Sequence, residues 1–135
     1  MEYNKIKAFI SNNDQFAKAN GIKLLEVAEG YAKTSMEIND KHLNAANLVH
    51  GGAIFTLADF AFAAASNSRN ALALAINVSI SFLNAAKSGT LYATAREVER
   101  NKKLASYRVD ITDKAGRVVA IFQGMVYIKK SSILK

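Results

Sequence analysis

The sequence predicts an α+β domain in which an antiparallel sheet wraps around one long apolar helix, with an extra helix at the N-terminus. An alanine-rich stretch without a breaker, residues 53–67, has the length and composition of a helix. After residue 69, polar and apolar side chains alternate over four successive runs, which is the period of strands. Domains usually contain ~100–150 residues. We therefore predict a single domain over residues 1–135.

The apolar pattern of the N-terminal segment predicts an amphipathic helix over residues 1–19. Its apolar side chains recur at roughly helical spacing, at Ile6, Phe9, Ile10 and Phe16. The chain contains no proline, so glycine and asparagine mark the turns.

Two short strands are expected next, at residues 22–28 and 31–38, with Gly30 at the turn between them. The second run alternates apolar with polar side chains, which indicates one buried and one exposed face. Residues 39–50 then form a polar loop, and the pair of strands forms a hairpin.

The apolar helix lies within a central segment of residues 51–69 and contains six alanines between residues 53 and 67. It contains no run of β-branched residues, and its small side chains allow strands to approach closely. We predict the remaining strands, in a meandering sheet, at residues 76–82, 90–98, 104–112 and 117–128.

Composition excludes several classes of protein. Half of the residues are hydrophobic, which is enough for an ordinary core and argues against disorder. The absence of cysteine excludes disulfides and thiolate chemistry and, with no secretory signal at residues 1–9, favours the cytoplasm. The longest apolar stretch, residues 53–65, is too short to cross a membrane and contains Asp59. A net charge of +7 favours anionic ligands.

Asp59 lies in the middle of the apolar helix and is the only acidic residue between Asp40 and Glu97. Burying an ionised carboxylate without partners is costly, so such a residue usually has a partner, an altered pKa or a reaction to perform. The structural alternative is a helix edge that reaches the surface at Asp59. We favour the functional interpretation.

His50, Gly51 and Gly52 begin this helix, where backbone N–H groups lack partners and the positive end of the helix dipole lies. Such a helix start binds phosphate or polarises a carbonyl as an oxyanion hole, although a tight loop-to-helix turn is the structural alternative. Gly52 and Asp59 are separated by ~10 Å along the axis. If both serve one reaction centre, Asp59 must come from an antiparallel second copy, which implies a two-fold dimer.

Other catalytic patterns are missing from the sequence. His42 and His50 are the only histidines, too few for a three-histidine metal site, and no HExxH spacing exists, so we expect no metal. There is also no G-x-S-x-G elbow, P-loop or G-x-G-x-x-G motif.

A longer pattern combines Asn44, the His50-Gly51-Gly52 run and residues 53–63, which include Asp59. This pattern resembles the signature of hotdog-fold acyl-CoA thioesterases, specifically the phenylacetic-acid-degradation subfamily. The resemblance covers about residues 21–130. It implies a sheet wrapped around one long helix, dimers that join their sheets, and usually tetramers built as dimers of dimers.

The resemblance also implies roles for individual residues. Asp59 matches the carboxylate that activates water or attacks the thioester, and it comes from the opposite subunit. Gly51 matches the residue whose N–H polarises the carbonyl. Asn44 matches the amide that holds the thioester or water, and His50 matches a motif histidine with a structural role. Gly52 is expected beside the substrate.

Three positions depart from the family pattern. Asn47 stands where the family often has glycine, and Ala85 or Ala86 where it often has proline. Where some relatives place a hydroxyl that orients water, this chain has Ala73 and Ala75, and Asn77 is the nearest candidate to replace that hydroxyl.

Basic residues concentrate late in the chain. Residues 96–130 contain nine Lys or Arg against four Asp or Glu. Arg100, Lys102 and Lys103 cluster at a predicted strand connection, where they can hold the phosphates of CoA, although a solvated turn is an equal alternative. No aromatic side chains interleave with the cluster, so we do not expect nucleic-acid binding.

These observations predict a thioester hydrolase that converts aryl- or medium-chain acyl-CoA to the free acid and CoA. CoA belongs to the substrate, so no separate cofactor is expected. The expected partners are acyl-CoA and further copies of this chain, with no membrane contact. The alternatives are a hotdog-fold enoyl- or hydroxyacyl-CoA hydratase-dehydratase and a non-catalytic acyl-CoA-binding protein.

Overall fold

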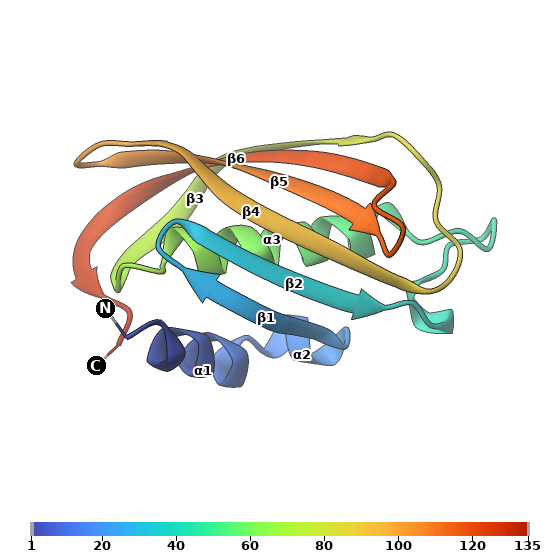
Figure 1. Ribbon diagram of the computed structural model, residues 1–135, viewed down its shortest axis with the longest axis horizontal. Helices are drawn as coiled ribbons and strands as arrows, with labels where there is room; N and C mark the ends of the chain where they lie inside the picture. The colour runs from blue at the N-terminus through green and yellow to red at the C-terminus, as the bar shows by residue number, and fades with distance from the viewer. Residues whose placement is uncertain (1, 135) are drawn as a thin grey trace.

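A six-stranded antiparallel sheet curves around one long helix in the computed structural model, which describes residues 2–134 (Figure 1). The helices are α1 (Tyr3–Asn13), α2 (Gln15–Ala19), the short 3₁₀ helix η1 (Asp40–His42) and α3 (Gly51–Ser66). The strands are β1 (Ile22–Ala28), β2 (Tyr31–Glu37), β3 (Ala71–Phe82), β4 (Thr90–Arg100), β5 (Leu104–Asp113) and β6 (Val118–Ser132). The predicted α+β architecture is confirmed. No helix in the described part of the chain is both long and apolar enough to span a bilayer.

The strand order, β1-β2-β4-β5-β6-β3, differs from a simple meander. β1 and β2 form the expected hairpin, and β4, β5 and β6 are neighbours in chain order. β3, however, pairs with β6 at the far edge, because α3 crosses the sheet before the chain enters β3 (Figure 1). Within residues 2–134, the other edge of β3 is therefore unpaired.

The N-terminal helix is divided, contrary to the single helix predicted over residues 1–19. Asp14 leaves the helical conformation, and its Oδ1 accepts a hydrogen bond from the Ala17 N–H at 3.0 Å. Aspartate is a strong N-cap, so it starts a second helix where it stands. Ile6 is buried as expected, but the bend leaves Phe16 67% exposed.

The core lies between α3 and the concave face of the sheet. The Phe62 ring packs against the rings of Tyr107 and Phe122, at centroid distances of 5.8 and 5.4 Å. Gly124 leaves the space that this ring occupies, since a Cβ there would lie 2.6 Å from the ring of Phe62. Small residues on the sheet therefore allow a large ring from the helix to fill the centre.

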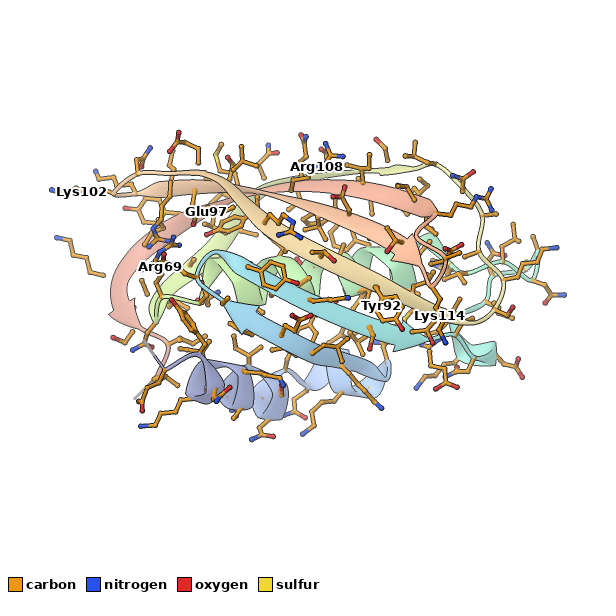
Figure 2. All side chains as sticks on the ribbon, in the orientation of Figure 1. Arg69, Tyr92, Glu97, Lys102, Arg108 and Lys114 are labelled. Carbon is orange, nitrogen blue, oxygen red and sulfur yellow. The ribbon has the colours of Figure 1, made fainter. Side chains whose placement is uncertain are left out.

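A partly buried polar network fixes the turn after α3 against β4 and β5 (Figure 2). The Arg69 guanidinium donates two hydrogen bonds to Glu97, at 2.6 and 2.9 Å, and the Tyr107 hydroxyl donates another at 2.7 Å. Burial acts to raise the pKa of Glu97, but these bonds and the neighbouring arginine charges outweigh it and lower that pKa. Burial and the bond to Glu97 raise the pKa of Tyr107 to about 12. The network therefore keeps one carboxylate ionised and the phenol neutral.

Candidate active site

The start of α3 presents one unused backbone donor. His50 has an extended backbone, and its Nδ1 accepts a hydrogen bond from the Gly52 N–H at 2.7 Å. The Gly51 N–H donates to no atom of residues 2–134. A ligand oxygen can therefore bind at the Gly51 N–H, whereas the Gly52 N–H already has a partner.

Asn44 and Gly51 line the same pocket, of about 350 Å³. The Asn44 Oδ1 accepts hydrogen bonds from the N–H groups of Ala46 at 2.9 Å and Leu48 at 3.2 Å. Its Nδ2 has no partner within the described chain. Two donors, one from backbone and one from a side chain, thus remain available in this pocket.

The loop before α3 explains one departure from the family pattern. Asn47 has a φ of 60°, in the left-handed region that favours glycine. Asparagine is among the few other residues that adopt it readily. Asn47 therefore adopts a backbone conformation that glycine also adopts freely.

Asp59 is half-buried on the stripe of α3 that the sheet does not cover. Across residues 2–134, its carboxylate has no hydrogen-bond or ion-pair partner. Burial raises the pKa of Asp59, and the negative charge of Asp14 raises it further. The carboxylate is thus a stronger base than an ordinary surface aspartate.

Asp59 does not join Asn44 and Gly51 within one chain. Gly51 and Asp59 are eight residues apart on one helix, which corresponds to ~12 Å of rise. Asp59 is also absent from the residues that line the pocket of Asn44 and Gly51.

Beside this helix stripe lies an uncovered apolar surface on β3. Ile76, Val78 and Phe82 are 56%, 36% and 53% exposed. Phe82 also reaches the start of α3, because a Cβ on Gly51 would lie 3.1 Å from its ring. An unpaired strand edge with exposed apolar side chains indicates an interface.

Asn77 lies on the opposite side of the sheet from α3. It pairs with Met125, whereas the next residue, Val78, pairs with Gly124, which faces the ring of Phe62. Because paired residues share a face, Asn77 points to the outer surface. Within one chain, it therefore does not reach Asp59.

The basic residues divide into two groups. Arg100 turns inward, and its Nη1 is buried 4.0 Å from the Glu97 carboxylate without a hydrogen-bond partner in the described chain. Lys102 and Lys103 instead border a pocket of about 680 Å³ that also includes Tyr127, Ile128, Lys129 and Lys130. The register of β5 against β6 brings these residues together, which the sequence reasoning missed.

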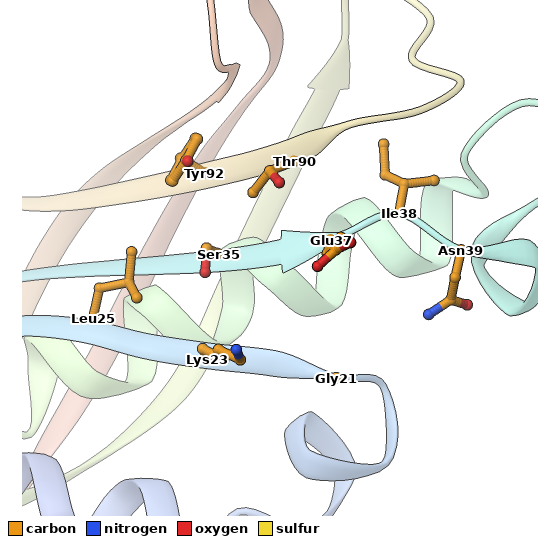
Figure 3. A pocket seen from close by; sticks show the side chains of 9 residues that line it. All are labelled: Gly21, Lys23, Leu25, Ser35, Glu37, Ile38, Asn39, Thr90 and Tyr92. Atoms are coloured by element: carbon orange, nitrogen blue, oxygen red, sulfur yellow. The ribbon is translucent and has the colours of Figure 1, made fainter.

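A further hollow of about 640 Å³ lies over β1, β2 and β4 (Figure 3). Its lining is polar in part and includes Lys23, Glu37 and Tyr92. Neither Gly51 nor Asp59 contributes to it, so it is separate from the candidate active site.

We expect Asp14→Asn to lower the pKa of Asp59 towards its ordinary value, because the substitution removes a nearby negative charge. Asparagine also caps helices, so α2 should persist. An NMR titration of the Asp59 carboxyl carbon measures the change. Asp40→Asn serves as the control, since the charge of Asp40 does not contribute to the shift. An unchanged Asp59 titration in Asp14→Asn would contradict the electrostatic explanation.

Comparison with known proteins identifies the family. Residues 46–120 match the family model described as the thioesterase superfamily. A putative esterase of Archaeoglobus fulgidus is 45% identical over 91% of this chain and 80% of its own length. The acyl-coenzyme A thioesterase PaaI of Escherichia coli is 39% identical over 83% of this chain and 81% of its own length. The structure of the E. coli PaaI protein from the phenylacetic acid degradation operon superposes with a TM-score of 0.93 and 34% identity, covering 96% of this chain and 95% of that one. The resemblance drawn from the motif is confirmed, and the chain belongs to the thioesterase superfamily.

Proposed function

We propose that this protein is an acyl-CoA thioesterase that hydrolyses aryl- or medium-chain acyl-CoA to the free acid and CoA, in the cytoplasm and without a separate cofactor. The observation that carries the proposal is the free Gly51 N–H at the start of α3, in one pocket with the free amide of Asn44. Membership of the thioesterase superfamily supports it. The names of the relatives favour neither of the two alternatives, a hydratase-dehydratase or a non-catalytic acyl-CoA-binding protein.

The helix start acts on the carbonyl oxygen of the thioester. The Gly51 N–H donates to this oxygen, and the positive end of the helix dipole stabilises the negative charge that develops on it. The Asn44 Nδ2 provides a second donor, to the carbonyl or to the attacking water. In other enzymes, losing one such donor lowers kcat by ~100- to 1000-fold.

Asp59 supplies the second half of the chemistry. As a general base, it removes a proton from water, whose oxygen then attacks the carbonyl carbon. As a nucleophile, the carboxylate attacks that carbon itself, and water hydrolyses the resulting anhydride. Either route breaks the carbon–sulfur bond and releases CoA. Both need the ionised carboxylate, which its raised pKa makes more basic.

The two halves meet only in an assembly of subunits. Since ~12 Å separates Gly51 from Asp59 along α3, the carboxylate at each site comes from an antiparallel partner helix. Placing Gly51 of one copy opposite Asp59 of the other puts the two-fold axis near Phe55, halfway between them. Pairing of the unpaired β3 edges would cover Ile76, Val78 and Phe82. We propose a dimer at minimum and a tetramer as a dimer of dimers.

We expect Asp59→Asn to keep the fold and to lower hydrolysis by ~100-fold or more, because the amide cannot accept the proton. A CoA-release assay over aryl, short-chain, medium-chain and long-chain acyl-CoAs measures this loss and identifies the acyl preference. Circular dichroism checks that the fold persists. Activity within a few-fold of the parent would refute the role of Asp59.

Mixed dimers test the shared site. Asp59→Asn and Gly51→Val should each be inactive, since each removes one half of every site. After random subunit exchange in an equal mixture, half of the dimers are mixed and contain one intact site of two. The mixture should therefore recover about a quarter of the parent activity. A mixture that stays inactive despite demonstrated exchange, or an active monomer, would show that the site is not shared.

The lysine pocket is the proposed site for the nucleotide phosphates of CoA, in place of the predicted group that included Arg100. We expect Lys102→Gln with Lys103→Gln to raise KM for acyl-CoA while kcat stays nearly constant, because the remote phosphates bind alike in ground and transition states. Hydrolysis of an acyl-thioethanol, which lacks the nucleotide, should be unchanged. Lys5→Gln with Lys7→Gln on α1 provides a matched change of charge. Equal KM values for both double variants would assign Lys102 and Lys103 to the solvated surface.

A further inference from the structure

A pocket smaller than the three described above lies between the N-terminal segment and α3, and the mechanism above does not use it. It measures about 220 Å³. Its walls include Phe9 and Ile10 of α1, Asp14 at the junction with α2, Ala63 of α3 and Ile133 near the C-terminus.

This pocket begins beside the reactive carboxylate. Ala63 follows Asp59 by four residues on α3, so the two side chains lie on one face, ~6 Å apart along the axis. Asp14 provides a second link, because it lines the pocket and its charge acts on Asp59. A group that extends from a thioester held at Asp59 therefore meets this pocket within one helical turn.

The amides around the pocket already have partners within the chain. The Asn67 Nδ2 donates to the Ala63 carbonyl at 2.9 Å, and its Oδ1 accepts from the Ala73 N–H at 2.9 Å. The Asn13 Nδ2 donates to the Phe9 carbonyl at 2.8 Å. These amides do not demand a polar ligand. The lining also contains the Asp14 carboxylate, which already accepts a hydrogen bond from the Ala17 N–H. The apolar walls, from Phe9, Ile10 and Ile133, suit an apolar ligand.

Two separate parts of the chain hold the pocket in shape. Ile10 is only 7% exposed and anchors α1 to the core. The C-terminal wall is fastened by Asn70, whose side-chain Oδ1 accepts from the Leu134 N–H at 2.7 Å and whose carbonyl accepts from the Ile133 N–H at 3.3 Å. The walls are therefore fixed before any ligand arrives, which favours discrimination by size.

We infer that this pocket receives the distal part of the acyl group, an aryl ring or a short alkyl chain, and sets the length of acyl group that the enzyme accepts. The inference rests on the proposed function and adds the residues that determine specificity. A cavity of ~150 Å³ lined by apolar side chains is enough to bind benzene. The volume of about 220 Å³ therefore accommodates one ring or a chain of a few methylenes.

Binding of S-alkyl-CoA thioethers tests the inference, because these analogues cannot be hydrolysed. Isothermal titration calorimetry with alkyl chains from two to ten carbons should show an affinity that rises ~4-fold per methylene and then levels off when the pocket is full. Hydrolysis of the matching acyl-CoAs by the parent is measured in parallel.

Two substitutions alter the pocket in opposite directions. Ala63→Leu fills it, so affinity should level off at a shorter chain and fall ~10-fold or more for the longest chain that the parent accommodates. The affinity for S-ethyl-CoA should not change. Phe9→Ala enlarges the pocket and should move the plateau to longer chains. Phe16→Ala, on the exposed face of neighbouring α2, removes the same side chain outside the pocket and should keep the parent profile.

The outcomes separate this inference from the proposed function. Affinity that does not depend on chain length, or parent-like profiles in both Ala63→Leu and Phe9→Ala, would overturn the acyl pocket even if the enzyme hydrolyses thioesters. A length-dependent affinity that responds to both substitutions, together with no CoA release by the parent, would support the pocket and overturn the thioesterase.

Discussion

Close packing of small side chains between α3 and the sheet is the constraint on which the rest of the molecule depends. Ala58, Ala61 and Ala64 of the helix are fully buried, as are Ala93 and Ala95 on the strand that faces them. With so little volume on either side, the sheet can bend around the helix, and the Phe62 ring fills the remaining space. Larger residues would push the layers apart. The helix is therefore fixed in both rotation and translation, and so are the groups along it.

Because α3 is fixed, its reactive groups are held in place, but an apolar surface on the neighbouring strand stays uncovered. The same helix carries the Gly51 N–H at its start and the Asp59 carboxylate in its middle. The neighbouring strand exposes Ile76 and Phe82, for which no other part of residues 2–134 provides a cover. In the proposed dimer, one face would serve both assembly and chemistry. Loss of the interface would then remove activity without any change in the active-site side chains.

The sequence was sufficient to predict the architecture because its helical pattern and its strand pattern are both clear. The alanine-rich run could only suit a buried helix, and the alternation after residue 69 could only suit strands. Strand order was not predictable, since the edge that β3 joins depends on where α3 delivers the chain. The division at Asp14 was missed because apolar spacing continues through Phe16 and gives no sign of a bend.

In the candidate site, too, a contact between residues close in sequence was predictable, whereas contacts set by strand pairing were not. Asn44 and Gly51 are close in sequence and meet in one pocket, as the motif predicts. The side chain of Asn77 was harder to place, because a bulge between Ala75 and Asn77 reverses the alternation of faces along β3. Lys129 and Lys130 join the other lysines through strand register, which no short motif records.

The cap that His50 places on α3 ties the first turn of this helix to a side chain that lies outside the helix. The Nδ1 of the ring accepts from the Gly52 N–H, and only a neutral imidazole with an unprotonated Nδ1 can do so. The oxyanion donor of Gly51 lies one residue away in the same turn. Losing the His50 ring would then loosen the turn that orients the carbonyl while leaving Gly51 and Asp59 themselves unchanged.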